Sequence, residues 1–513
     1  MHHSKIRDFS HIELLTDKCQ YKEALQELEN IEKSENLSQY EQISCYVLKS
    51  SLLFELGNYR KALNFIDQLI QEIQEPKYNL HLIDIFTIKS QILWRQGKSK
   101  EAINLIANSE SLLKSIHHEI PMELNKRAAR LADIKGWIYI YEGDINKATE
   151  NMELSFKLRK EVEDKREIAL SYYLKGNIYF YYRIDWEYSK KCIQKAFDLA
   201  KEKDFKSLMS LCLTRLGDFF LIQSDLERTF EFYNRALDLS KHIEYKKGIA
   251  FSLGGLAYLY EQQGNLNRAL EFADQSINTY QEMGDIFGMI ENLDTSFWLT
   301  LNNNDLERTK YYFNRIEQLI EHNNFKMEKI FFQLNKALLL KTIPLASNQA
   351  KAKEILLGMV REKKMFEVAI FFEVAYRALL NLCDLLLNEL RNTNNLELLN
   401  DIQYYINEML ELSRNANSYW WLVETYLLRE KLELITLDLK KAKTSLNQAQ
   451  EIAEKYGLIQ LNEKILVERC ELHEQLNKWE LLRNSKAQIT ELIDLAQIDN
   501  QLIRMLKRRY SLS

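Results

Sequence analysis

The sequence predicts an all-α fold, an α-solenoid built from antiparallel helical hairpins. Two observations lead to this expectation. A turn signal returns about every forty residues along the 513 residues of the chain, and only 14 glycines and 3 prolines occur in the whole length. A repeat of about 20 to 50 residues is typical of solenoids, and average proteins contain about 7% glycine and 5% proline. Few residues therefore remain for loops or strands.

The turn signal separates the two helices expected in each hairpin. It consists of a small or polar residue, an aromatic residue or leucine two positions later, and a small residue five positions later, as in Gly57-Asn58-Tyr59…Ala62 and Gly264-Asn265-Leu266…Ala269. The marks fall near Cys19, Gly57, Gly97, Gly143, Ile184, Ser224, Gly264, Asn304, Ser347, Asn394, Leu437 and Asn477. About a dozen hairpins are therefore expected.

The helices on either side of each mark have apolar stripes and small residues. In 211–223, Leu213, Leu216, Gly217 and Phe220 recur at three- and four-residue spacing, which places them on one helix face. Small residues allow a neighbouring helix to approach closely. The expected points of close approach are Gly136, Gly176, Gly217 and Ala257 in first helices, and Ala196, Ala236, Ser276 and Ala449 in second helices.

These pieces resemble a known repeat. Segments such as 175–179 (KGNIY) and 216–220 (LGDFF) precede the turns, and 232–237 (FYNRAL) follows one. They are similar to the tetratricopeptide repeat, and the spacing resembles the longer repeats of kinesin light chain-type adaptors. The resemblance implies a right-handed superhelix. It covers 130–320 best, and beyond 320 the spacing becomes irregular.

The resemblance suggests four segments. Residues 1–10 would be a short N-terminal lead, 11–340 the regular superhelix, 341–500 divergent helical hairpins, and 501–513 a basic C-terminal tail. The tail contains Arg504, Lys507, Arg508 and Arg509. Cations at the C-terminal end of a last helix are favoured by its dipole, and contact with nucleic acid or an acidic membrane is the alternative interpretation.

Composition indicates a cytoplasmic protein. The net charge of −5 shows no basic excess and argues against nucleic acid as the main partner. Six scattered cysteines without a C-x-x-C pair are expected to be reduced and buried. The most apolar stretch, 369–387, has a polar stripe of Glu373, Arg377, Asn381 and Asp384, which is typical of a packed helix and not of a membrane span.

Motifs for catalysis, metals or cofactors are incomplete. Gly97-Lys98-Ser99 lacks the glycine that a phosphate loop needs five residues earlier, because position 92 is Ile. His117-His118-Glu119 and His473-Glu474 lack the second histidine of a metalloprotease helix. We therefore expect no enzyme activity, no cofactor and no metal, and assign no catalytic residues.

The resemblance implies a binding surface on the first helices, which line the concave face in such proteins. The corresponding positions are Asp133, Trp137, Tyr141, Tyr173, Asn177, Tyr181, Asp218, Tyr258 and Gln262. Aromatic rings with a few polar groups suit a surface that holds a polypeptide. The alternative is that these rings pack adjacent repeats together. Many peptide-binding repeats have an asparagine two residues before the small residue, where this chain has Ile134, Leu174, Arg215 and Gly255.

The sequence therefore predicts a scaffold or adaptor that binds a protein or peptide partner. A regulatory sensor, in which a peptide or small ligand alters partner binding, is the alternative function. Three adjacent side chains cannot all face one side of a helix, so at least one ring of Tyr419-Trp420-Trp421 is expected to be exposed or to meet a neighbouring unit, which makes the run an interface candidate. Packing in the core is the favoured interpretation of the run as a whole. Partner identity and oligomeric state stay open.

Overall fold

The computed structural model describes residues 9–33, 37–73, 75–116, 121–182, 185–222, 225–321, 323, 326–362, 371–416, 418–484 and 487–507. This part of the chain contains 26 α-helices, one short 3₁₀ helix and no strand, which confirms the expected all-α solenoid. Contacts divide the chain into two units, of which unit 1 comprises 1–221 and 225–329 and unit 2 comprises 222–224 and 330–513.

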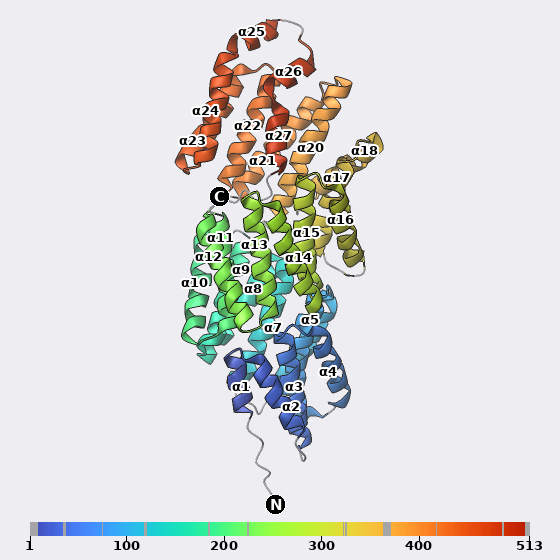
Figure 1. The fold of residues 1–513 in the computed structure, drawn as a ribbon, viewed down its shortest axis with the longest axis vertical. Coiled ribbons are helices and arrows are strands. Elements are labelled where there is room, and N and C mark those ends of the chain that lie inside the picture. The colour runs from blue at the N-terminus through green and yellow to red at the C-terminus, as the bar shows by residue number, and fades with distance from the viewer. Residues whose placement is uncertain are drawn as a thin grey trace, which may run out of the picture. The chain divides into compact units, whose positions relative to one another are not determined.

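Unit 1 is a succession of helical hairpins (Figure 1). Its helices are α1 (Ser10–Asp17), α2 (Tyr21–Glu32), α3 (Gln39–Glu55), α4 (Tyr59–Glu72), η1 (Pro76–Tyr78), α5 (Asn79–Arg95), α6 (Ser99–Ser115), α7 (Pro121–Glu142), α8 (Ile145–Val162), α9 (Lys165–Tyr181), α10 (Trp186–Glu202), α11 (Lys206–Ile222), α12 (Leu226–His242), α13 (Lys246–Gln262), α14 (Leu266–Met283), α15 (Ile286–Asn302) and α16 (Leu306–Glu321). The next helix, α17 (Lys326–Lys341), begins in unit 1 and ends in unit 2.

The turn marks are confirmed at most positions. Eight of the twelve have a left-handed backbone conformation, with φ between 53° and 78°: Cys19, Gly57, Gly97, Gly143, Gly264, Asn304, Asn394 and Leu437. A left-handed residue just after a helix turns the chain away and lets its amide bond back to the last turn. At Gly57, for example, the amide donates to the carbonyl oxygen of Phe54 at 2.9 Å.

Two further marks, Ser347 and Asn477, are described and are not turns of this kind. Ser347 lies inside α18, because the chain turns earlier, around Pro344, which lacks the amide hydrogen that would continue the preceding helix. Asn477 lies inside α25, and the break falls at Gln475 instead. Both expectations were wrong. Ile184 and Ser224 lie outside the described residues.

Close helix approach is confirmed at Gly176 and Gly217, whereas a β-carbon on Gly136 would lie 3.4 Å from Cδ2 of Leu174, which is near an ordinary contact distance. A β-carbon on Gly176 would lie 2.5 Å from Cδ1 of Ile193, and one on Gly217 would lie 2.5 Å from Cε1 of Tyr233. Real β-carbons do not come this close to other heavy atoms. The expected second-helix positions are fully buried, with 0% exposure at Ala196, Ala236, Ser276 and Ala449. The small residues therefore determine which helices pack in contact.

Unit 1 also packs on itself over long sequence distances. One apolar cluster joins Ile12, Cys19 and Tyr21 to Leu211 and Tyr245. A second cluster joins residues of α3 to α5 with others of α13 to α15. The N-terminal helices α1 to α5 therefore contact helices that lie about two hundred residues later in the sequence.

Ion pairs reinforce this closure. Arg166 Nη1 lies 2.6 Å from Asp17 Oδ1, and Arg95 Nη1 lies 2.8 Å from Asp285 Oδ2. The second pair is the more shielded, since the Asp285 side chain is 0% exposed and that of Arg95 is 12% exposed. Asp285 also caps α15 by accepting from the amide of Gly288 at 3.0 Å.

Replacing Asp285 with Asn should weaken the closure and leave the helix cap intact, because Asn and Asp cap equally well. Loss of the charge-assisted bond to Arg95 should lower the free energy of unfolding by about 1–3 kcal/mol. Urea unfolding measures the loss, and amide hydrogen exchange should become faster in α5 and α15. Asp305→Asn is the control, since Asp305 pairs with the exposed Arg308, and a change below about 0.5 kcal/mol is expected there. Equal losses in the two variants would contradict a role for Asp285 in closure.

Unit 2 contains the end of α17 together with α18 (Ala346–Arg361), α20 (Phe372–Thr393), α21 (Leu398–Asn415), α22 (Tyr419–Ile435), α23 (Leu439–Lys455), α24 (Ile459–Glu474), α25 (Leu476–Asn484), α26 (Ile489–Ala496) and α27 (Ile498–Lys507). The polar stripe expected on α20 consists of paired groups, since Arg377 pairs with Glu373 at 3.0 Å and the other two residues contact a lysine of α17. Lys341 Nζ donates to Asn381 Oδ1 at 2.7 Å and pairs with Asp384 Oδ2 at 2.5 Å. Pairing explains how these polar groups are accommodated within an apolar helix.

The C-terminal helix α27 packs back on α20 and α22 (Figure 1). Gln501 Nε2 donates to the carbonyl oxygen of Glu424 at 2.9 Å and to its Oε2 at 2.7 Å. Residues 501–507 therefore continue a packed helix, whereas Arg508 and Arg509 lie outside the described residues. The division of the chain at 340 and 500 stays a prediction.

Two rings of the aromatic run at the start of α22, Trp420 and Trp421, are buried, and the third, Tyr419, is partly exposed. The ring of Trp421 stacks on Tyr376 with centroids 4.5 Å apart, and Tyr419 stacks on Tyr456 at 3.4 Å. Trp420 is 8% exposed. The two tryptophan rings therefore contribute to the interior of unit 2, and Tyr419 fits the expectation that at least one ring stays at the surface.

The cysteines are all free thiols, and five of the six are buried. Cys470 is exposed, so the expectation that all six are buried was wrong at this position. Across the described residues, no helix is long and apolar enough to cross a membrane.

Candidate functional site

Aromatic and charged side chains from the first helices of several hairpins meet in unit 1. We call this set the inner cluster: Trp94 and Arg95 of α5, Tyr141 of α7, Tyr181 of α9, Arg215 of α11, and Asp285, Phe287 and Glu291 at the start of α15. The Tyr141 ring lies 4.4 Å from the Phe287 ring and 5.6 Å from that of Trp94. The closure of unit 1 thus brings α5 and α15 to the same surface.

Hydrogen bonds hold the inner cluster in position. Tyr141 Oη donates to Tyr181 Oη at 3.0 Å, and Arg215 Nη2 donates to the same oxygen at 3.2 Å. Arg215 Nη1 donates to Asp218 Oδ2 at 2.8 Å, and Tyr233 Oη donates to Asp218 Oδ1 at 2.7 Å. This chain of bonds connects α7, α9, α11 and α12, so the rings of the cluster are presented from a rigid frame.

Burial determines the protonation of this frame. It raises the pKa of Tyr141 and Tyr181, which keeps both hydroxyls neutral and able to donate hydrogen bonds. Burial also raises the pKa of Asp218, an effect that the Arg215 guanidinium partly offsets. Arg215 itself lies over the Phe180 ring, 4.4 Å from its centroid. The cation is therefore held by a carboxylate, a hydroxyl and an aromatic face.

Glu291 differs from the other charged groups of the inner cluster. Its side chain is exposed. Surrounding protein atoms still displace much of its water, and together with the carboxyl groups of Glu328 and Asp285 they raise the pKa of Glu291 to about 8. Among the described residues it forms no ion pair. The inner surface thus contains a carboxyl group that changes its charge near neutral pH.

Five of the residues predicted from the sequence lie together at or beside the inner cluster. Tyr141, Tyr181 and Asp218 belong to the hydrogen-bonded frame. The Trp137 ring stacks on Tyr141 with centroids 6.4 Å apart and lies 6.2 Å from Tyr173. All five side chains are half-buried, so part of each packs against the protein and part is accessible to a binding partner.

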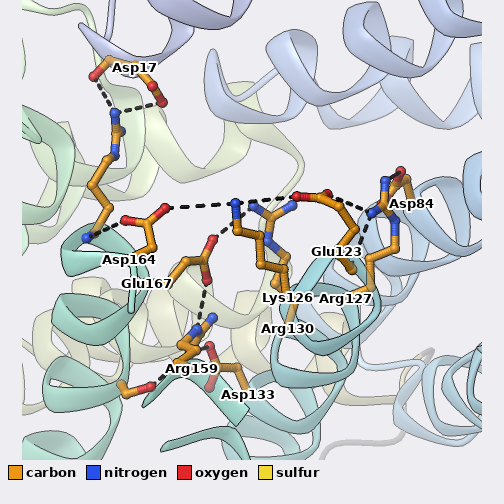
Figure 2. A network of polar contacts seen from close by, with 12 residues as sticks. Asp17, Asp84, Glu123, Lys126, Arg127, Arg130, Asp133, Arg159, Asp164 and Glu167 are labelled. Carbon is orange, nitrogen blue, oxygen red and sulfur yellow. Dashed lines mark hydrogen bonds and ion pairs between the residues drawn. The ribbon is translucent and has the colours of Figure 1, made fainter. Parts of the chain in front are cut away.

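The predicted residue Asp133 is committed to a different network, between α7 and α8 (Figure 2). Its Oδ2 lies 2.5 Å from Arg159 Nη1, and its Oδ1 accepts from Ser155 Oγ at 2.6 Å. Arg159 also pairs with Glu167 of α9 at 2.7 Å. Burial alone would raise the pKa of Glu167, but the guanidinium groups of Arg130 and Arg159 lower it to about 2. Asp133 therefore holds the two helices of its own hairpin together, and Arg159 extends the network to the next hairpin through Glu167.

The remaining three predicted residues take no part in the hydrogen bonds that hold the inner cluster in position. Asn177 is 0% exposed, and its Nδ2 donates to the carbonyl oxygen of Tyr173 at 2.8 Å. Tyr258 accepts from Thr295 Oγ1 at 3.0 Å, which joins α13 to α15. Gln262 is exposed at the last position of α13. Of these three, only Tyr258 and Gln262 have surface available to a partner.

Sequence reasoning missed the charged members of the inner cluster. For Arg215 a signal exists, because Arg215 and Asp218, three residues apart, are opposite charges on a helix face that also contains the apolar Leu211 and Phe219. For Glu291, the signal is its position four residues after Phe287, on the same helix face. No local signal identifies Arg95, since its contact with Asp285 depends on the closure of unit 1.

Known proteins share this architecture. Residues 209–282 match the family model described as tetratricopeptide repeat. The solved Rap protein complexed with Competence and Sporulation Factor has a TM-score of 0.50 and 11% identity, and the match covers 74% of this chain and 99% of that chain. Aspartyl phosphate phosphatase F from Bacillus subtilis has a TM-score of 0.42 and 12% identity, and the match covers 74% of this chain and 95% of that chain. The STAND protein with a tetratricopeptide repeat sensor from Pyrococcus horikoshii has a TM-score of 0.40 and 15% identity, and the match covers 68% of this chain and 53% of that chain.

No curated protein matches the chain significantly. At such low identity the solved structures show the fold alone. The family match thus identifies tetratricopeptide repeats in residues 209–282, and the solved structures show that the described chain has the corresponding α-solenoid fold. Its similarity to kinesin light chain-type repeats stays a prediction.

Proposed function

We propose that this tetratricopeptide-repeat protein is a non-catalytic scaffold that holds a partner polypeptide at the inner cluster of unit 1. One observation supports this most. The half-buried rings of Trp137, Tyr141, Tyr173 and Tyr181 stand on a frame that is already hydrogen-bonded. Aromatic side chains dominate many protein interfaces, and a preorganised surface avoids much of the entropy cost of binding.

The contacts of the inner cluster favour binding over catalysis. Asp218 of the hydrogen-bonded frame is bonded to Arg215 and Tyr233, and Asp285 of the inner cluster is bonded to Arg95. These groups have structural partners, and burial keeps the tyrosines protonated. A nucleophile with an adjacent general base, which acyl or phosphoryl transfer would need, is not part of this arrangement of described residues.

A double variant tests the proposed surface. Changing Trp137 and Tyr181 to Ala removes two rings of the surface, and we expect a captured partner to bind at least about tenfold more weakly. The measurement is affinity purification of the full chain followed by mass spectrometry, with helicity checked by circular dichroism. Phe230→Ala with Tyr311→Ala is the control, since these rings on α12 and α16 are 46% and 54% exposed. Retention of the same partners by the W137A/Y181A variant, with helicity unchanged, would rule out this surface.

The alternative function is a regulatory sensor. A specific observation favours keeping it, because Arg95 and Asp285 join the early and late helices of unit 1 within the inner cluster. A ligand there would contact both and could alter how they pack. The Rap protein of similar fold was solved in complex with Competence and Sporulation Factor. In thermal melts, a peptide ligand that binds the folded protein should raise the melting temperature with increasing concentration.

A further inference from the structure

Among the described residues, two carboxyl groups form no ion pair with a cation: Glu291 of the inner cluster, and Glu328 beside it. Arg95 is neutralised by Asp285, and Arg215 by Asp218. Glu291 and Glu328 remain after these pairs are removed. Glu328 exerts the strongest charge effect on Glu291, which shows that the two carboxyl groups are near one another. This part of the surface therefore has an excess of negative charge whenever both are ionised.

Glu328 provides a second, independent observation. It lies in the first turn of α17 and is 6% exposed. Its Oε1 is buried and meets no hydrogen-bond donor among the described residues. A buried carboxylate oxygen without a donor costs free energy, so the position would gain from a ligand that supplies an N–H group.

Aromatic rings lie beside the same carboxyl groups. Phe287 and Glu291 are four residues apart on α15, so their side chains are neighbours on one face. The Phe287 ring contacts the Tyr141 ring at 4.4 Å, and Glu291 acts electrostatically on both Tyr141 and Tyr181. A cation placed at Glu291 would thus also be close to aromatic faces, which attract ammonium and guanidinium groups.

We propose that Glu291 and Glu328 form the seat for a lysine or arginine side chain of the partner, with the rings of Tyr141 and Phe287 beside it. This inference rests on the proposed function, because it specifies the chemistry of the polypeptide held there. An organic cation fits better than a metal ion, since no group of three or more possible metal ligands occurs among the described residues. A guanidinium or ammonium group would supply both the charge and the missing donor.

A basic peptide provides the direct test. Fluorescein-labelled hexaarginine and hexalysine are titrated with the full chain, and fluorescence anisotropy measures their affinity, with hexaglutamate as the negative probe. We expect Glu291→Gln to weaken binding of a basic peptide about tenfold, because it removes a charge partner from a partly desolvated site. Glu307→Gln is the matched control, since its side chain on α16 is 92% exposed, and it should bind as the wild type does.

The pH dependence gives a second measurement. A bound cation favours the ionised carboxyl group, so affinity should increase as pH rises from 6 to 9 through the pKa of Glu291 at about 8. This increase should shrink in the Glu291→Gln variant. The ionisable groups around Glu291 are Glu328, Asp285, Arg215, Arg95, Tyr141, Tyr181 and Tyr280.

Three outcomes would overturn the assignment. They are the absence of basic-peptide binding to the wild type, equal binding by the Glu291→Gln and wild-type proteins, and displacement of the peptide by millimolar calcium beyond the effect of matched sodium chloride. Partner capture separates this inference from the proposed function. If the Glu291→Gln variant keeps a partner that the W137A/Y181A variant loses, the result supports the proposed binding surface. The same result contradicts the proposal that Glu291 binds a basic side chain of the partner.

Discussion

Replacing Arg159 with Met is expected to lower the free energy of unfolding by about 3–5 kcal/mol. The Arg159 side chain is 1% exposed and pairs with both Asp133 and Glu167, at 2.5 and 2.7 Å. Methionine fills similar space but leaves two carboxylates without this cation, and an unpaired buried charge is more costly than an absent pair. Chemical denaturation of the full chain measures the loss.

The control for this variant is Arg235→Met. Arg235 pairs with Glu231 at 3.0 Å on the exposed face of α12, where both side chains are more than half exposed. Such pairs contribute at most about 1 kcal/mol. Similar losses in the two variants would mean that the pairs of Arg159 add nothing beyond those of a surface arginine.

The Arg159→Met variant should also change how the free energy of unfolding depends on pH in the acidic range. The folded-state pKa of Glu167 is about 2, below its ordinary value of 4.5, so this carboxylate stabilises the fold above pH 4.5 and the contribution is lost as pH falls towards 2. The difference corresponds to about 3 kcal/mol as an upper bound. Without Arg159, the pKa of Glu167 should rise, and the loss of stability between pH 4.5 and 2 should become shallower.

Replacing Tyr233 with Ala should destabilise the protein by about 3–5 kcal/mol, the range for large aromatic residues in cores. The Tyr233 side chain is 0% exposed. Its ring fills the space that two glycines leave, since β-carbons on Gly217 and Gly255 would lie 2.5 and 2.8 Å from it. Tyr233→Phe keeps the ring and loses only the bond to Asp218, so a loss of about 1 kcal/mol is expected.

A double-mutant cycle examines the reason for this effect. Gly217→Ala should destabilise the wild type although alanine favours helices, because the added carbon collides with the Tyr233 ring. In the Tyr233→Ala background the same change should be neutral or stabilising. Additive effects measured by denaturation would show that ring and glycine do not interact.

Much of the fold could be predicted because its signals are local. The left-handed turns at Gly57 and Asn304, and the close approach at Gly176, depend on residues within one hairpin. The prediction failed at Ser347 and Asn477, where the repeat has drifted and the chain turns at nearby residues instead. A repeat pattern identifies helix ends well only while its spacing is regular.

The candidate site was less predictable. The repeat pattern places the rings of Trp137, Tyr141 and Tyr181 on the first helices of their hairpins, and the structure brings these rings into contact. Whether such a side chain faces a partner or a neighbouring helix depends on which charges lie opposite. Asp133 is close in sequence to Trp137, yet it pairs with Arg159 in the second helix of the same hairpin.

The sequence alone thus determined the helical class, the hairpin repeat and the aromatic character of the first helices. These properties depend on periodicity and residue size within about forty residues. Only the tertiary structure decided that unit 1 packs on itself, so that Arg95 meets Asp285 and Glu291 lies beside Tyr141 and Glu328. The physical reason is that small rotations between successive hairpins accumulate along a solenoid. Contacts between residues about two hundred positions apart therefore follow from the sum of many packing angles and from no single motif.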